Sequence, residues 1–241
     1  MGSDRFDFQQ FSIQQDRCAM KVGIDAVVLG TSAEIPSFCY HALDIGTGTG
    51  ILALMLAQRS PATAVDAVEN EPSAATQAAE NVAASPFASQ VTVHQTAIQA
   101  FRPKHTYDLI ICNPPYFSDS LPSPNAARQQ ARHTTTLSHA DLLASVARLL
   151  NPTGSFWTIL PFEGHLAFVR TANSYHLKPA KQIRVAPFPD KSPNRIILQF
   201  TRFGSRVSVE TLTIRQRVVE QGQPPQYTEQ FRTRSAEFYL R

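Results

Sequence analysis

The first two-thirds of the chain alternates short apolar runs with longer Ala- and Leu-rich segments, which predicts strands that are each followed by a helix. Leu109-Ile110-Ile111 is continuously apolar, as is typical of a strand buried on both faces of a parallel sheet. Pro61 lies just after one Ala/Leu-rich segment and Pro72 begins the next, which are positions where proline ends and starts helices. These elements together predict a doubly wound α/β sheet, mostly parallel, with helices on both faces. The predicted strands cover 41–45, 63–68, 90–95, 107–112 and 154–160, and the predicted helices cover 49–58, 72–84, 138–150 and 163–174.

The pattern changes beyond the fourth predicted strand. Residues 117–136 are rich in Ser, Pro, Asn and Gln and predict a long loop, which in a compact domain is usually functional or disordered. Nearer the C-terminus, two apolar runs are separated by turn-forming residues, which predicts an antiparallel hairpin. The predicted C-terminal elements are strands over 180–186 and 195–202 joined by a turn at 190–194, a strand over 207–214 and a docked helix over 231–240.

Composition restricts the class of protein. The chain has 241 residues, of which 43% are hydrophobic and 17% charged, and this balance fits one globular domain of ordinary size. No apolar run approaches the roughly 18–20 residues that span a bilayer, and the N-terminus has no signal-peptide pattern. Cys18, Cys39 and Cys112 are too widely spaced for a metal motif. We therefore expect a reduced cytoplasmic protein with no metal, no membrane association and no evident obligate protein partner.

Charge is divided unevenly between the two halves of the chain. Residues 1–120 contain 6 Lys/Arg and 12 Asp/Glu, a net charge of −6, whereas residues 121–241 contain 16 Lys/Arg and 7 Asp/Glu, a net charge of +9. A basic second half favours a polyanionic partner such as a nucleic acid. A solvated basic surface without such a partner is the alternative, because charge alone indicates association and not chemistry.

A glycine-rich turn follows the predicted strand 41–45. It reads Asp44-Ile45-Gly46-Thr47-Gly48-Thr49-Gly50, and glycines let the chain turn tightly and let a ligand approach the backbone. Glu69 ends the next predicted strand, about 20 residues on, where a carboxylate can accept hydrogen bonds from both ribose hydroxyls. NAD, FAD and S-adenosylmethionine all fit such a turn. The Gly-x-Gly-x-Gly spacing with Asp44 at the mouth favours S-adenosylmethionine, since an acidic group suits an amino group and a sulfonium better than a pyrophosphate.

The fourth predicted strand leads directly into Asn113-Pro114-Pro115-Tyr116 and Phe117. The two prolines form a rigid segment without competing N–H donors. The Asn113 side-chain oxygen and the Pro114 carbonyl can each accept a hydrogen bond from one planar NH2 group, which favours the tetrahedral nitrogen of a transition state. Tyr116 can stack on a planar substrate, and a base in a nucleic acid must be unstacked to reach it. The tetrapeptide predicts a planar amine substrate, and adenine and glutamine both remain open.

These motifs together resemble the Rossmann-like class I methyltransferases that modify adenine N6 or a glutamine amide nitrogen. A longer segment upstream resembles the opening of one family, the bacterial tRNA1(Val) (adenine(37)-N6)-methyltransferases. That segment reads Gln10-Phe11-x-Ile13-x-Gln15-Asp16-Arg17-Cys18-Ala19-Met20-Lys21-Val22-Gly23-x-Asp25. The similarity extends through about residue 203, and the terminal Glu237-Phe238-Tyr239-Leu240 also fits.

The resemblance implies a Rossmann-like fold with a C-terminal antiparallel hairpin, and S-adenosylmethionine as the cofactor. Asn113 to Tyr116 would hold the target adenine. Ile24 departs from a small polar residue in the family pattern, and Ala97 stands in place of an Asp that pairs with the cofactor adenine; losing such a hydrogen bond costs about 0.5–1.5 kcal/mol. The implied cofactor residues are Lys21, Val22 and Gly23 at the methionine end, Asp44, Gly46, Thr47 and Gly48 at the amino group and backbone, Glu69 and Asn70 at the ribose, Ala97 and Ile98 at the adenine, and Asn113.

The implied substrate is an adenine in tRNA, and the basic residues are candidate phosphate contacts. They are Arg128, Arg132 and His133 in the long loop, and Lys178, Lys181 and Arg184 near the predicted hairpin; Phe117, beside the tetrapeptide, is a further candidate substrate contact. We expect residues 1–203 to form the methyltransferase domain, with 1–40 lining the cofactor and substrate, and 204–241 to form an extension packed on it. Glutamine-N5 methylation of a protein and an RNA-binding module without catalysis are the alternatives.

Overall fold

The computed structural model describes residues 4–18, 21–115, 137–204, 206–217 and 226–239. An eight-stranded sheet runs through these residues in the order β10-β8-β9-β7-β6-β3-β4-β5, and every neighbouring pair is parallel except those that involve β9. This arrangement confirms the predicted parallel sheet with an antiparallel hairpin. The strands are β3 (His41–Ile45), β4 (Ala64–Glu69), β5 (Val91–Gln95), β6 (Tyr107–Cys112), β7 (Leu150–Pro161), β8 (Lys178–Ala186), β9 (Arg195–Thr201) and β10 (Ser208–Thr213).

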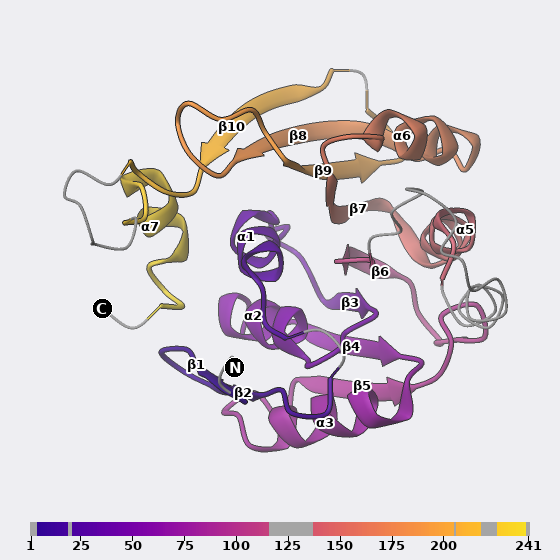
Figure 1. Cartoon of the computed structure of the whole chain (residues 1–241). Helices are drawn as coiled ribbons and strands as arrows, with labels where there is room; N and C mark the ends of the chain where they lie inside the picture. Colours follow the sequence, from indigo (N-terminus) through magenta and orange to yellow (C-terminus); the bar gives the residue numbers. More distant parts are fainter. Residues whose placement is uncertain (1–3, 19–20, 116–136, 205, 218–225, 240–241) are drawn as a thin grey trace, which may run out of the picture.

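Helices cover both faces of the sheet (Figure 1). One buried apolar cluster joins one face of the strands to α1 and α2, and a second joins the other face to α5 and α6. Ser138 caps the N-terminus of α5, where its hydroxyl accepts a hydrogen bond from the Asp141 amide at 3.0 Å. The helices are α1 (Ile24–Ser32), α2 (Ile51–Arg59), α3 (Pro72–Ala83), α5 (His139–Leu149), α6 (His165–Ser174) and α7 (Glu229–Ser235).

The N-terminal segment contains elements that the sequence pattern did not predict. The strands β1 (Arg5–Asp7) and β2 (Ser12–Gln14) form a separate antiparallel pair, and α1 follows at Ile24. Helix α1 contains Val27-Val28, Gly30 and Thr31, which are weak helix formers. Every residue from Ala26 to Ser32 is buried, so α1 has no polar face and no periodicity to recognise.

In the C-terminal region one predicted element differs from the structure and one is confirmed. The predicted helix over 231–240 is the shorter α7, and its first residue is Glu229 because the hydroxyl of Thr228 caps it by accepting from the Phe231 amide at 3.1 Å. The strand predicted over 207–214 is β10, which pairs in parallel with β8 at the end of the sheet. The division of the chain at residue 203 stays a prediction.

Side chains of α3 hold the N-terminal segment in place. Gln77 and Asn81 lie four residues apart and therefore share one face of the helix. The Asn81 side chain accepts from the Gln14 amide at 2.8 Å and donates to the Gln14 and Thr49 carbonyls, both at 2.9 Å. Gln77 donates to the Asp16 carboxylate at 2.7 Å. The polar residues of the opening segment thus have a structural role, which is to fasten that segment to α3.

The two ends of the described chain also meet. The Gln9 amide donates to the Phe238 carbonyl at 2.8 Å, and the rings of Phe8 and Phe238 pack edge-to-face with centroids 6.4 Å apart. Helix α7 lies beside α1 and β10, and Phe231 is fully buried there. The N-terminal segment is therefore held from two directions, by α3 and by the residues after α7.

We expect Asn81→Ala to destabilise the fold strongly for a single polar substitution. It removes three hydrogen bonds and leaves the part-buried backbone groups of Gln14 and the buried Thr49 carbonyl without this partner. An unsatisfied buried polar group costs about 1–3 kcal/mol, so the free energy of unfolding should fall by about 2–3 kcal/mol in urea denaturation. Glu80→Ala is the control, because its ion pair with Arg17 is exposed and contributes less than about 1 kcal/mol. Equal losses in the two variants would contradict the role of Asn81.

Candidate cofactor and substrate site

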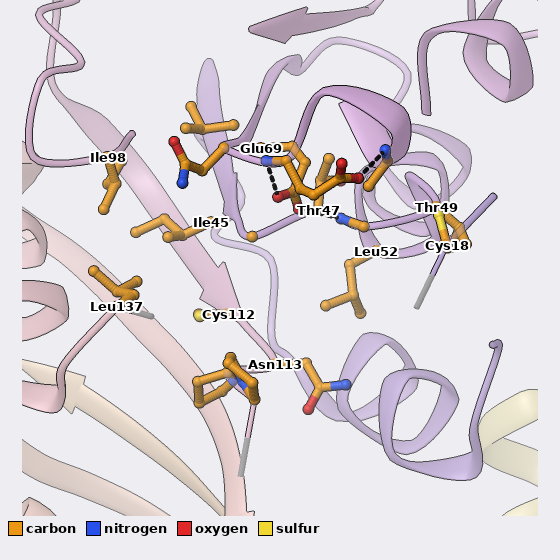
Figure 2. A pocket seen from close by; sticks show the side chains of 18 of the residues that line it. Cys18, Ile45, Thr47, Thr49, Leu52, Glu69, Ile98, Cys112, Asn113 and Leu137 are labelled. Atoms are coloured by element: carbon orange, nitrogen blue, oxygen red, sulfur yellow. Dashed lines mark hydrogen bonds between the residues drawn. The ribbon is translucent and has the colours of Figure 1, made fainter. Parts of the chain in front are cut away.

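The main pocket has a volume of about 610 Å³ and lies where the central strands end. Residues that follow β3, β4, β5 and β6 line it, together with the segment that leads into α1. Ligands in doubly wound sheets bind outside the carboxyl ends of the strands, so the pocket lies where the fold predicts a site. Figure 2 shows Glu69 and Thr47 on one side of the pocket and Asn113 on the opposite side.

The glycine-rich turn after β3 forms one wall. Gly46, Gly48 and Gly50 have φ angles of +69°, +57° and +86°, which side chains with a Cβ rarely adopt. A Cβ at Gly46 or Gly48 would point into open space, with no atom within 4 Å. These two glycines are therefore required by the backbone conformation, and the space beside them is left for a ligand.

Asp44 lies beneath this turn and does not line the pocket. Its side chain is fully buried; Oδ2 accepts from the Thr47 hydroxyl at 2.5 Å and from the Ala53 amide at 3.2 Å. Oδ1 has no hydrogen-bond partner among the described residues. Burial raises the pKa of Asp44 to about 7, although the hydrogen bonds from Thr47 and Ala53 lower it. The sequence placed this carboxylate at the mouth, whereas the structure places it under the turn.

Glu69 joins the turn to the neighbouring strand. Its Oε2 accepts from the Gly48 amide and its Oε1 accepts from the Glu71 amide, both at 2.9 Å. Each carboxylate oxygen can accept more than one hydrogen bond, so both oxygens retain capacity for hydroxyl groups of a ligand. Glu71 in turn caps α3, accepting from the Ser73 and Ala74 amides. The predicted ribose-binding residue is thus in place and is fixed by the backbone on both sides of it.

The opposite wall carries the predicted substrate residues. Asn113, Pro114 and Pro115 line the pocket where β6 ends, and Lys21, Val22 and Gly23 line it from the N-terminal segment. The Lys21 ammonium group forms an ion pair with Asp4 at 2.7 Å. Tyr116, Phe117, Arg128, Arg132 and His133 lie outside the described residues.

A partly apolar part of the pocket separates these two walls. Ile98, Cys112 and Leu137, labelled in Figure 2, all line the pocket. Ile98 and Cys112 belong to one buried apolar cluster, and Leu137 packs against it. Asn70, Ala97 and Ile98 line the pocket as predicted. The sequence analysis missed Cys112 and Leu137, although the position of Cys112 as the last residue of a predicted strand could have identified it.

The predicted phosphate contacts on β8 do not form one track. Lys181 forms ion pairs with Glu34 at 2.7 Å and Glu210 at 3.7 Å. Side chains alternate along a strand, so Lys181 and Arg184 project from opposite faces of the sheet. Lys178 begins β8 and therefore lies at the end of the sheet away from the pocket, because β8 runs in the same direction as β7 and β6.

The pocket fits S-adenosylmethionine. Gly46 and Gly48 leave room for a ligand against the backbone, and Glu69 can accept from ribose hydroxyls. Ile98 and Leu137 offer apolar surface to a purine ring. Among the described residues, no group of three or more His, Cys, Asp or Glu side chains is placed to hold a metal ion.

Comparison with known proteins agrees with this geometry. Residues 33–165, more than half of the chain, match the family described as Methyltransferase small domain. The crystal structure of a predicted O-methyltransferase from Agrobacterium tumefaciens has the same fold. Its TM-score is 0.64 at 16% identity, over 89% of this chain and 96% of that one. Fold and site thus define a class I methyltransferase, for which S-adenosylmethionine is the methyl donor.

Curated relatives define the family within this class. A tRNA1(Val) (adenine(37)-N6)-methyltransferase from Parabacteroides distasonis is 41% identical over 100% of both chains. One from Tolumonas auensis is 43% identical over 100% of this chain and 99% of its own. The chain belongs to the tRNA1(Val) (adenine(37)-N6)-methyltransferase family. This confirms the resemblance that the opening segment indicated. None of the helices in the described ranges is long and apolar enough to cross a membrane.

We expect Glu69→Gln to weaken cofactor binding. The amide has one acceptor oxygen in place of two, so it cannot accept from both Gly48 and Glu71 and also from a ribose hydroxyl. Hydrogen bonds to charged groups contribute about 1.5–3 kcal/mol, which corresponds to a rise in Kd of about 10–100-fold. Isothermal titration calorimetry with S-adenosylmethionine measures this change. Glu80→Gln, an exposed acidic position on α3, is the matched control and should leave the Kd unchanged. An unaltered Kd for Glu69→Gln would remove Glu69 from the cofactor site.

Asp44 predicts a specific dependence of stability on pH. Its folded-state pKa of about 7 lies above that of the unfolded chain, so folding takes up a proton between about pH 4 and pH 7. The contribution of Asp44 to stability is therefore fully present below pH 4 and is lost as the pH rises through 7. The Asp44→Asn side chain does not titrate. Between about pH 4 and pH 7 the free energy of unfolding of this variant should therefore rise relative to that of the wild type, by up to about 4 kcal/mol. Urea denaturation of both proteins from pH 5 to pH 8 measures the difference, and a difference independent of pH would contradict the raised pKa.

Proposed function

We propose that this chain transfers a methyl group from S-adenosylmethionine to the exocyclic N6 of an adenine in tRNA, namely adenosine 37 of tRNA1(Val). The observation that carries the proposal is the position of Asn113-Pro114 across one pocket from the Gly48–Glu69 wall, in a chain whose full-length relatives bear that name. A methyl donor held at the glycine-rich wall and an amine held at Asn113 would face each other across the same cavity.

The chemistry required of the protein is modest. The bound cofactor supplies an activated methyl group, so the residues need chiefly to position and polarise the amine. The nitrogen lone pair of adenine N6 is delocalised into the ring, which makes the amine a poor nucleophile. The Asn113 side-chain oxygen and the Pro114 carbonyl accept its two hydrogens and favour the tetrahedral geometry that the nitrogen adopts during attack. The nitrogen becomes acidic once it is alkylated, so its proton leaves without a dedicated base.

Several further features support this proposal. An adenine in tRNA must leave its stack to enter a pocket, and Tyr116 is the predicted stacking partner for the extruded base. Asn113 and Glu69 are both present, which argues against a module that has lost catalysis. The basic second half and the names of the relatives favour an RNA substrate over the amide of a protein glutamine. An enzyme of this kind would act in the cytoplasm, where tRNA is modified.

We also propose that the whole chain works as one unit, with a methyltransferase domain over 1–203 and an extension over 204–241. The pairing of β10 with β8 and the contact between Phe8 and Phe238 support a packed extension. The pocket position of Lys21 to Gly23 supports a cofactor-lining role for the N-terminal 40 residues.

We expect Asn113→Ala to reduce turnover without preventing cofactor binding. Loss of one preorganised hydrogen-bonding group in an active site costs about 10²–10³-fold in kcat. Incubation with radiolabelled S-adenosylmethionine and separated cellular RNA and protein, followed by nucleoside analysis, measures the activity. The wild type should place label in N6-methyladenosine of tRNA. Label confined to protein would overturn the adenine substrate, and full activity of Asn113→Ala would overturn the role of the amine-binding pair.

A further inference from the structure

The basic residues of the second half divide by their contacts. Four of them make contacts that hold the fold together. Arg148 donates to the Phe101 and Ile98 carbonyls at 2.9 and 3.0 Å, and Arg202 donates to the Ala147 carbonyl. The other two, Lys181 and Arg234, form ion pairs with Glu210. The excess of positive charge in the sequence therefore overstates the cationic surface.

Other cations gather at the end of the sheet where the pocket opens. We call this end the carboxyl edge, because β3, β4, β6 and β7 all finish there. Strands β8 and β10 run in the same direction as β7, so the residues after them also lie at this edge; β9 runs the opposite way, so its first residue does too. The basic residues placed there are Lys191, Arg195, Arg215 and Arg217, which we call the basic ridge.

Local contacts hold the basic ridge together. The Arg215 amide donates to the Pro187 carbonyl at 3.1 Å, which places the chain after β10 against the turn that joins β8 to β9. The Arg215 guanidinium lies 5.3 Å from the centroid of the Tyr227 ring. Arg217 pairs with Asp190 at 2.7 Å, yet 71% of its side chain remains exposed. Lys191 is exposed beside them. Backbone hydrogen bonds fix Arg215, which is half-buried, and Lys191, and both Lys191 and Arg217 face solvent.

The basic ridge reaches the mouth of the pocket. Arg195 Nε lies 3.0 Å from Asp25 Oδ2, and Asp25 lines the pocket at the start of α1. Glu69 and Glu71 line the pocket where β4 ends. One side of the mouth is therefore acidic and the other is basic. A polyanion that approaches the pocket is repelled on the β4 side and attracted on the side of β9, β8 and β10.

We propose that the basic ridge holds the phosphodiester backbone of the RNA whose adenine enters the pocket; this inference rests on the proposed function. A base extruded from its stack leaves the phosphates of its own and flanking nucleotides at the mouth of the pocket. Contacts to those phosphates set the register of the strand without reading its sequence. In this arrangement the RNA backbone runs from the mouth of the pocket over the ends of β9, β8 and β10, and does not cross the end of β4.

A matched pair of double variants tests this proposal. Lys191→Glu/Arg217→Glu reverses two charges of the basic ridge, whereas Lys178→Glu/Arg206→Glu reverses two exposed charges at the opposite end of β8 and β10. Each double variant changes the net charge from +3 to −1, so any difference between them reports position and not total charge. All four side chains are exposed, and thermal unfolding checks that both variants fold.

The readouts are the Kd for unmodified tRNA transcript, measured over a range of salt concentrations, and the Kd for S-adenosylmethionine. We expect the ridge variant to raise the Kd for tRNA by roughly tenfold or more and to reduce the slope of log K against log salt by about two. The opposite-end variant should change the Kd for tRNA and the salt slope much less. Neither double variant should alter the Kd for S-adenosylmethionine. Equal effects of the two variants, or no effect of the ridge variant, would overturn the inference.

The same experiment separates this inference from the proposed function. Wild-type protein that neither binds nor methylates tRNA would refute the proposed function, whatever the variants do. Wild-type protein that binds and methylates tRNA, together with a ridge variant that binds it equally well, would refute the basic ridge alone.

Discussion

Glu69 accepts hydrogen bonds from the Gly48 and Glu71 amides at 2.9 Å, and the rest of the site depends on this one carboxylate. The two amides belong to the segments that follow neighbouring strands, β3 and β4. Holding both with one side chain fixes the glycine-rich turn and the start of α3 relative to each other. Helix α3 then anchors the N-terminal segment through Gln77 and Asn81. The wall that faces the cofactor and the wall that carries Lys21 to Gly23 are thus tied to the same group.

The distribution of charge follows from the same arrangement. The carboxylates Glu69 and Glu71 lie where β4 ends, on the side proposed to hold a cofactor with hydroxyl and amino groups. Cations gather on the side of β9, β8 and β10, beyond the strand that carries the amine-binding residues. The domain therefore places the proposed cofactor site and the proposed RNA contacts on different parts of the same sheet. In this proposal one half of the sheet holds a small polar cofactor and the other half contacts a large polyanion.

Sequence patterns predicted the regular part of the fold because strands and helices alternate there with clear punctuation. The succession of strands and helices along the chain and the places of Glu69 and Asn113 follow from local chemistry and from the rule for parallel sheets. Helix α1 was missed because burial on all sides removes its polar face. The side chains of Asp44 and Lys181 were misplaced for a related reason. Their environment is set by tertiary contacts, and no spacing along the chain encodes those contacts.

The meeting of the two ends of the chain has a consequence for biosynthesis. The hairpin of β1 and β2 is made first, yet its apolar side packs on Phe238, and the Gln9 side chain donates to the Ala236 carbonyl at 2.8 Å. A nascent chain lacks these partners until residues 236–239 have been translated. The opening segment, which lines the pocket, is thus completed late although it is translated early. Closure of the wall that Lys21 to Gly23 form therefore waits for the C-terminal residues of the described chain.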